Sequence, residues 1–108
     1  MKFGLKDKDI TAISAVFSLY ENIDTVLLYG SRVKGNYKPG SNIDLTIDGN
    51  LTFYEQMRLE NELDDLLLPY KIDLSVKHKL SNSDLLEHIQ RVGKVFYQKL
   101  KEERPPLH

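Results

Sequence analysis

Two segments of the chain place apolar residues at every second position. Ile43, Leu45 and Ile47 alternate with polar residues, and residues 70–76 repeat the pattern. Successive side chains of a β-strand point to opposite faces, so this period of two predicts two strands, each with one buried and one polar face. Residues 25–29 are instead continuously β-branched or apolar and end at a glycine, which is typical of a short buried strand.

Helical patterns separate these strands. Apolar residues recur every three to four positions from residue 10 to residue 20, and Asp7 is the expected N-cap of that helix. Thr52 and Glu55 have the spacing of a capping box, in which each residue satisfies a backbone N–H of the other. The helix that follows is expected to continue through two further leucines, Leu66 and Leu67, until Pro69 ends it.

The C-terminal third predicts one more helix and one more strand. Leucine, isoleucine and valine residues at helical spacing over residues 85–92 indicate a helix capped by Ser81 or Ser83 and closed by Gly93. Residues 95–97 are expected to form a short final strand.

Together these elements predict one α+β domain, a small mixed β-sheet with helices packed mainly on one face. We expect the domain to occupy residues 1–98, followed by a charged, proline-containing tail at residues 99–108. The exposed apolar edges of so small a sheet also suggest pairing with another chain, a second copy included.

Charge and cysteine content exclude several function classes. The 108 residues carry 15 basic and 16 acidic side chains, a formal net charge of −1, whereas dedicated polyanion binders usually have a clear basic excess. We therefore expect no direct nucleic-acid binding, although a small phosphate ligand stays compatible. The absence of cysteine excludes disulfides, thiolate metal sites and a cysteine nucleophile. No apolar run approaches a membrane span and the N-terminus lacks a signal-peptide core, so a cytoplasmic protein is expected.

The residues most informative about function follow the first predicted strand. Gly30 and Ser31 come directly after it, where a glycine lets the backbone approach a ligand and N–H groups and a hydroxyl can face a phosphate. Asn42 and Asp44 lie two apart on the next strand and share a face. Asp73 lies on the polar face of the third strand. If the two strands are neighbours, Asp44 and Asp73 can lie side by side.

Two carboxylates at that separation are stabilised by a divalent cation between them. Oxygen ligands without histidine or cysteine favour Mg²⁺, with Mn²⁺ as the alternative. His78 and His88 have no acidic or histidine partner at ligand spacing, and we assign them no metal role. A phosphate-binding turn beside a carboxylate–metal pair is the arrangement used for phosphoryl or nucleotidyl transfer.

At these residues the chain resembles the minimal nucleotidyltransferases of the DNA polymerase β superfamily. The resemblance rests on Gly30-Ser31, on a spacer containing Gly35, on Ser41-x-x-Asp44-Leu45 and on the later Asp73, and it extends from the first helix to about residue 97. It implies a polymerase β-like core that transfers a nucleoside monophosphate from an NTP, ATP being favoured, to an acceptor hydroxyl.

The resemblance also implies a role for each site residue. Gly30, Ser31 and Ser41 would bind the nucleotide, Arg32 and Lys34 would neutralise phosphate charge, and Asn42, Asp44 and Asp73 would face the metal, with Asp44 and Asp73 as the catalytic pair. Small stand-alone members of this family are often antitoxins of HEPN-type ribonuclease toxins, which some of them nucleotidylylate. A helical HEPN-type protein is therefore the expected partner.

The chain departs from the family pattern at position 42. The family has Asp-x-Asp where this chain has Asn42-Ile43-Asp44, so one metal-binding charge is missing. An amide oxygen can still ligate Mg²⁺, but we expect weaker metal binding and slower chemistry. Asp48 lies four residues beyond Asp44, roughly 13 Å along a strand, too far to replace the missing group. Two alternatives follow: a nucleotide-binding partner that neutralises a toxin by contact without catalysis, and a small interaction domain with no ligand.

Overall fold

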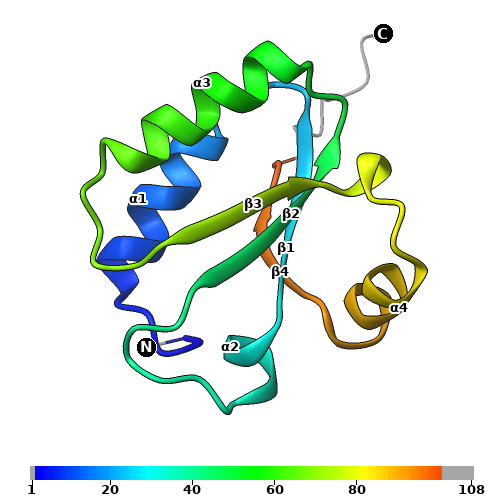
Figure 1. Cartoon of the computed structure of the whole chain (residues 1–108). Helices are drawn as coiled ribbons and strands as arrows, with labels where there is room; N and C mark the ends of the chain where they lie inside the picture. Colours follow the sequence, from blue (N-terminus) through cyan, green and yellow to red (C-terminus); the bar gives the residue numbers. More distant parts are fainter. Residues whose placement is uncertain (1, 101–108) are drawn as a thin grey trace, which may run out of the picture.

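The computed structural model describes residues 2–100, so most of the tail predicted at 99–108 lies outside the described residues. The elements, shown in Figure 1, are α1 (Asp7–Phe17), β1 (Ile23–Tyr29), α2 (Ser31–Lys34), β2 (Ile43–Gly49), α3 (Phe53–Asp64), β3 (Ile72–Val76), the 3-10 turn η1 (Lys77–Lys79), α4 (Ser83–Val92) and β4 (Lys94–Gln98). Each strand and helix predicted from the sequence is present.

The four strands form one mixed sheet in the order β3-β2-β1-β4. Strand β1 pairs antiparallel with both β2 and β4, whereas β2 and β3 are parallel. Parallel neighbours need a crossover connection, and α3 supplies it between β2 and β3. The mixed α+β sheet is therefore confirmed.

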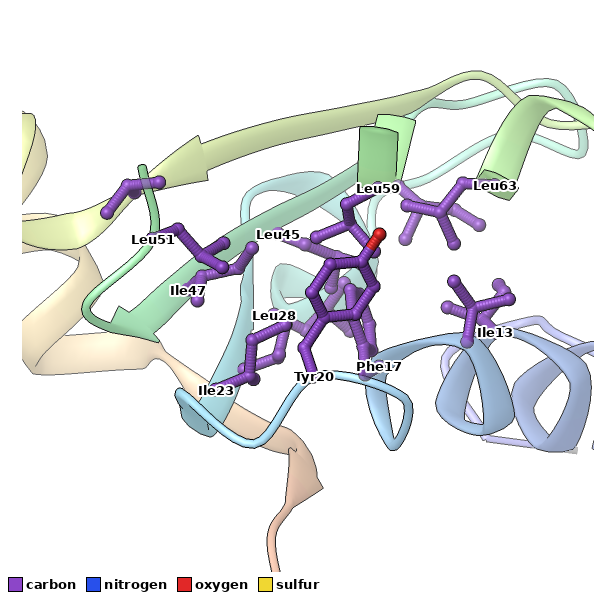
Figure 2. Close-up of a cluster of buried hydrophobic side chains, with 14 of the residues drawn as sticks. Ile13, Phe17, Tyr20, Ile23, Leu28, Leu45, Ile47, Leu51, Leu59 and Leu63 are labelled. Carbon is purple, nitrogen blue, oxygen red and sulfur yellow. The ribbon is translucent and has the colours of Figure 1, made fainter. Parts of the chain in front are cut away.

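Helices α1 and α3 cover one face of this sheet (Figure 1), and the core lies beneath them. Ile13 and Phe17 of α1 meet Leu59 of α3 and Leu28 and Leu45 of the central strands, and all five are fully buried (Figure 2). Burying side chains of this size stabilises the fold by about 1.5–3 kcal/mol each. This packing fixes which side chains of the strands point away from the core.

Helix α4 lies on the other side of the sheet from α1 and α3 (Figure 1), where it packs against β1. The expectation of helices mainly on one face thus holds for the two longest helices, while α4 borders the opposite face. Among the described residues, 2–100, no helix is long and apolar enough to cross a membrane.

Several element boundaries differ from the predictions. The N-cap of α1 is Lys6, which makes no side-chain cap, and Asp7 lies inside the first turn, where a negative charge is favourable. Asn82, rather than either neighbouring serine, caps α4, because its side-chain oxygen accepts the Leu85 N–H at 3.1 Å. Helix α3 ends at Asp64 rather than after Leu67, whose φ of 52° cannot continue a helix.

Candidate nucleotide and metal site

The parallel register of β2 and β3 places Asp44 directly beside Asp73. Neighbouring strands lie about 4.8 Å apart, and side chains at paired positions project to the same face. The residues on either side of Asp44, Ile43 and Leu45, are fully buried in the core, so the two carboxylates belong to the face that α1 and α3 leave free. The expected juxtaposition of these two acids is confirmed.

This pair is electrostatically unfavourable without a counter-charge. Burial, and then the negative charge of Asp73, raise the pKa of the Asp44 carboxyl, while the positive charge of Arg32 and the nearby His88 act in the opposite direction. A divalent cation between the two carboxylates would relieve this repulsion.

The oxygen donors present suit one hard cation such as Mg²⁺ or Mn²⁺. Asp44 and Asp73 provide carboxylate oxygens, and Asn42, which is exposed just before β2, carries an amide oxygen of the kind that such a cation also accepts. Within residues 2–100 no cluster of three or more acidic, histidine or cysteine side chains has the geometry of a metal site.

Gly30 lies against the Asp44 carboxylate. Its φ of 80° and ψ of −153° belong to a region that side-chain-bearing residues rarely adopt. A Cβ added here would overlap Asp44 Oδ2 and lie 3.2 Å from Asp44 Cγ. Glycine is therefore favoured at this position for two reasons: the backbone conformation, and the close approach between the end of β1 and the Asp44 side chain of β2. Ser31 follows as the first residue of α2.

His88, to which the sequence analysis assigned no metal role, also borders the site. The Gly30 N–H donates to Nε2 of His88 at 3.3 Å, and the His88 ring packs edge-to-face on Tyr29, with centroids 6.1 Å apart. Burial above all raises the pKa of the Tyr29 phenol, to which the charges of Asp44 and Asp73 add. His88 lies 58 residues from Gly30 in the chain, so no local pattern could have linked them.

Arg32 has a different place from the one expected. It is only 3% exposed, and its guanidinium donates to the backbone carbonyls of Phe3 at 2.9 Å and Ser41 at 2.8 Å. The rings of Tyr37 and Tyr70 lie on it, with centroids 5.2 and 5.0 Å from Cζ. The protein's own carbonyls thus occupy this guanidinium, and Arg32 holds the 35–41 loop and the N-terminal segment together rather than facing a phosphate.

The remaining predicted residues border the same loop. The Ser41 hydroxyl accepts the Lys38 N–H at 2.8 Å and so closes a turn before β2. Lys34, at the end of α2, is exposed to solvent. The structure therefore brings Gly30, Asp44 and Asp73 together, whereas Arg32 and Ser41 shape the loop beside them.

Comparison with known proteins identifies the family and the fold. The family model described as "Polymerase beta, Nucleotidyltransferase" matches residues 11–102, most of the chain. The chain belongs to the polymerase beta nucleotidyltransferase family.

One curated relative is the "Probable protein adenylyltransferase MntA" of Haemophilus influenzae, which is 29% identical over 107 residues, or 97% of this chain and 93% of the relative. Two solved structures share the fold. One, described as a toxin–antitoxin with AMP-PNP, has a TM-score of 0.67 at 20% identity over 88% of this chain and 75% of the other. The second, a tri-AMPylated Shewanella oneidensis HEPN toxin in complex with MNT antitoxin, has a TM-score of 0.64 at 16% identity over 88% and 74%.

The departure from the family pattern at position 42 stays a prediction. Asn42 lies just before β2, and Asp48, the nearest further acid on that strand, lies at its far end opposite Thr25.

Proposed function

We propose that this protein transfers the AMP group of ATP to a hydroxyl group of another protein. The observation that carries the proposal is the pairing of Asp44 with Asp73 at one register position, beside the glycine turn at Gly30. The name of the Haemophilus relative, a probable protein adenylyltransferase, supports AMP as the group and a protein as the acceptor.

In this proposal each residue has a defined part. The backbone N–H groups of Gly30 and Ser31 bind the triphosphate, and a phosphate oxygen takes the place that His88 Nε2 now holds on the Gly30 N–H. Asp44, Asp73 and the Asn42 amide oxygen hold a divalent cation, which when bound supplies charge neutralisation at the triphosphate.

The reaction itself is a displacement at the α-phosphorus. The acceptor oxygen forms a bond to the α-phosphorus, the bond from that phosphorus to the bridging oxygen of the β-phosphate breaks, and pyrophosphate leaves. Asp73 accepts the proton of the acceptor hydroxyl, because it lies on the edge strand of the sheet, where an acceptor can approach. Asp44 lies between Gly30 and Asp73 and so keeps the bound nucleotide next to the residue that accepts the proton.

Asn42 supports a second candidate, in which the chain binds nucleotide and partner without efficient transfer. Removing one formal charge beside a divalent ion weakens a large electrostatic contribution even when solvent screens it. The solved relatives described as toxin–antitoxin complexes support a HEPN-type toxin as the partner under both candidates.

Label transfer separates the two candidates. We would incubate the chain with α-labelled ATP, Mg²⁺ or Mn²⁺ and a HEPN-type toxin, for the unchanged chain and for Asn42→Asp. Slow transfer by the unchanged chain that Asn42→Asp accelerates is the expected result. Transfer by Asn42→Asp alone supports the binding-only candidate.

The controls test the assigned acids. Asp44→Asn and Asp73→Asn are expected to abolish transfer while the fold stays intact, and Asp48→Asn, an exposed acid on the same strand as Asp44, is expected to leave transfer unchanged. No transfer by either the unchanged chain or Asn42→Asp contradicts the enzymatic proposal. Equal loss in Asp48→Asn contradicts the assignment of the pair.

A further inference from the structure

Strand β3 is an edge strand whose outer side is free in the described part of the chain. It has β2 as its neighbour on one side, and in Figure 1 no other strand lies along its outer side. The Ile43 N–H donates to the Lys71 carbonyl at 2.8 Å, which sets the phase of the parallel ladder. Because backbone groups alternate in direction along a strand, those of Asp73 face β2 and those of Ile72 and Leu74 face outward.

A groove runs between this edge and α3. It has a volume of about 330 Å³, and Leu63, Leu68, Ile72 and Leu74 supply its apolar lining. Asp73 is also among the residues that line it. An edge strand beside a groove under a helix is the arrangement in which extended peptides bind as an added strand, with alternate side chains entering the groove.

We propose that the acceptor hydroxyl is presented by an extended peptide segment that binds the outer edge of β3 as a fifth strand; this inference rests on the proposed function. In an antiparallel addition, the residue opposite Asp73 forms a pair without mutual hydrogen bonds, with Cα atoms about 4.5 Å apart. Its side chain then projects to the same face as the Asp73 carboxylate, which lies beside Asp44. A hydroxyl there is within reach of the group that accepts its proton.

The residues before and after the hydroxyl residue have the opposite orientation. They lie across from Ile72 and Leu74, bond to the outward backbone groups of these residues, and point their side chains toward α3 and the groove. The geometry therefore assigns the acceptor a pattern of apolar–hydroxyl–apolar residues.

The charge around the groove defines the peptide further. Glu60, Asp64 and Asp73 line it together with a single basic residue, Lys71. Since complementary charge favours association, we expect a lysine or arginine beside the apolar–hydroxyl–apolar core. An uncharged or acidic peptide of the same pattern should bind several-fold more weakly.

The test uses the whole chain and a blocked synthetic peptide, Arg-Val-Thr-Val-Lys. Amide hydrogen exchange is measured residue by residue along β3 without and with the peptide. We expect the outward N–H groups of Ile72, Leu74 and Val76 to become protected on binding, while those of Asp73 and Ser75, which already face β2, change little. Absence of protection at millimolar peptide, or equal protection of all five, overturns the proposal.

Backbone methylation of the peptide provides the matched control. The N–H groups of the two valines face β3 in the proposed complex, whereas the threonine N–H faces away. N-methylation of the valines should abolish binding, and N-methylation of the threonine should leave binding within about threefold. Equal effects of the two modifications would refute the strand-addition mode.

Label transfer then separates this inference from the proposed function. With α-labelled ATP and Asn42→Asp, the threonine peptide should be labelled and its valine-methylated form should not. If the outward N–H groups of β3 become protected but the peptide is not labelled, the peptide binds as an added strand but is not the acceptor. Labelling of a HEPN-type toxin with no peptide protection at β3 leaves the proposed function standing and overturns this inference.

Discussion

The close approach of Gly30 to Asp44 can be tested by a single methyl group. In Gly30→Ala the new Cβ overlaps the Asp44 carboxylate, and the backbone keeps φ near 80° and ψ near −153°. Holding a residue with a side chain in that region costs about 1–3 kcal/mol. Turning the carboxylate away from its preferred rotamer adds about 0.5–1.5 kcal/mol. We therefore expect the free energy of unfolding to fall by roughly 2–4 kcal/mol.

A double-mutant cycle isolates the carboxylate contribution. In an Asp44→Ala background the overlap disappears, so the same Gly30→Ala change should cost about 1 kcal/mol less. Gly35→Ala is the matched control, because Gly35 also has a positive φ, 85°, but no atom lies within 4 Å of its added Cβ. Its cost of about 1–2 kcal/mol should not depend on Asp44. Urea denaturation followed by circular dichroism measures all six proteins of the two cycles.

Gly30→Ala should also reduce the rate of AMP transfer, because it displaces the Asp44 carboxylate. Displacing a reacting group by about 1 Å can reduce a rate about 100-fold. In the Asn42→Asp background we expect a loss of that order for Gly30→Ala and less than about threefold for Gly35→Ala. A coupling between Gly30→Ala and Asp44→Ala below about 0.5 kcal/mol would refute the reasoning, because such sites would be independent. Equal transfer rates of the two glycine variants would refute the functional part.

Three further predictions concern the stability of the fold. Arg32→Met should lower the free energy of unfolding by about 2–3 kcal/mol, since two partly buried carbonyls lose their donors. Exposed Lys34→Met should change it by less than about 0.5 kcal/mol, and urea denaturation distinguishes the two variants. Thr52→Ala should cost about 1 kcal/mol in the same assay by removing the α3 capping box, and an unchanged midpoint would contradict that role. Burial, and then its hydrogen bond to Glu62, raise the pKa of Tyr20 to about 12. The free energy of unfolding that depends on the protonated phenol is therefore fully present below pH 10 and is lost between pH 10 and 12. Tyr20→Phe should not show this loss when unfolding is measured across the same pH range.

Much of the fold could be predicted because its signals are local. The period of two in β2 and β3 reports which side chains of a strand face the core, and a few consecutive residues are enough to show it. The capping box of Thr52 and Glu55 is equally local, since both of its hydrogen bonds join residues three apart. The caps of α1 and α4 were predicted less well, because adjacent polar residues compete for the same role and only the final backbone conformation selects one of them.

In the candidate site, too, some residues could be predicted from local sequence patterns and others could not. The glycine turn and the two strand acids carry their own local signals, and so they could be chosen from the sequence. Arg32 could not be placed, because a basic residue next to a glycine-serine turn has the same pattern whether it faces a phosphate or the carbonyls of Phe3 and Ser41. The position of His88 beside Gly30 could not be predicted either, since this contact depends on where α4 packs.

What the sequence by itself determined is the four strands, the three longer helices and the buried faces of β2 and β3, because each depends on neighbours within a few residues. The tertiary structure alone decided that β2 and β3 are parallel neighbours with Asp44 and Asp73 at one register position. It also decided that the Asp73 strand is an edge with an open outer side in the described part of the chain. The physical reason is that strand order and register follow from burying α1 and α3 against the whole sheet, a condition that no short segment expresses on its own.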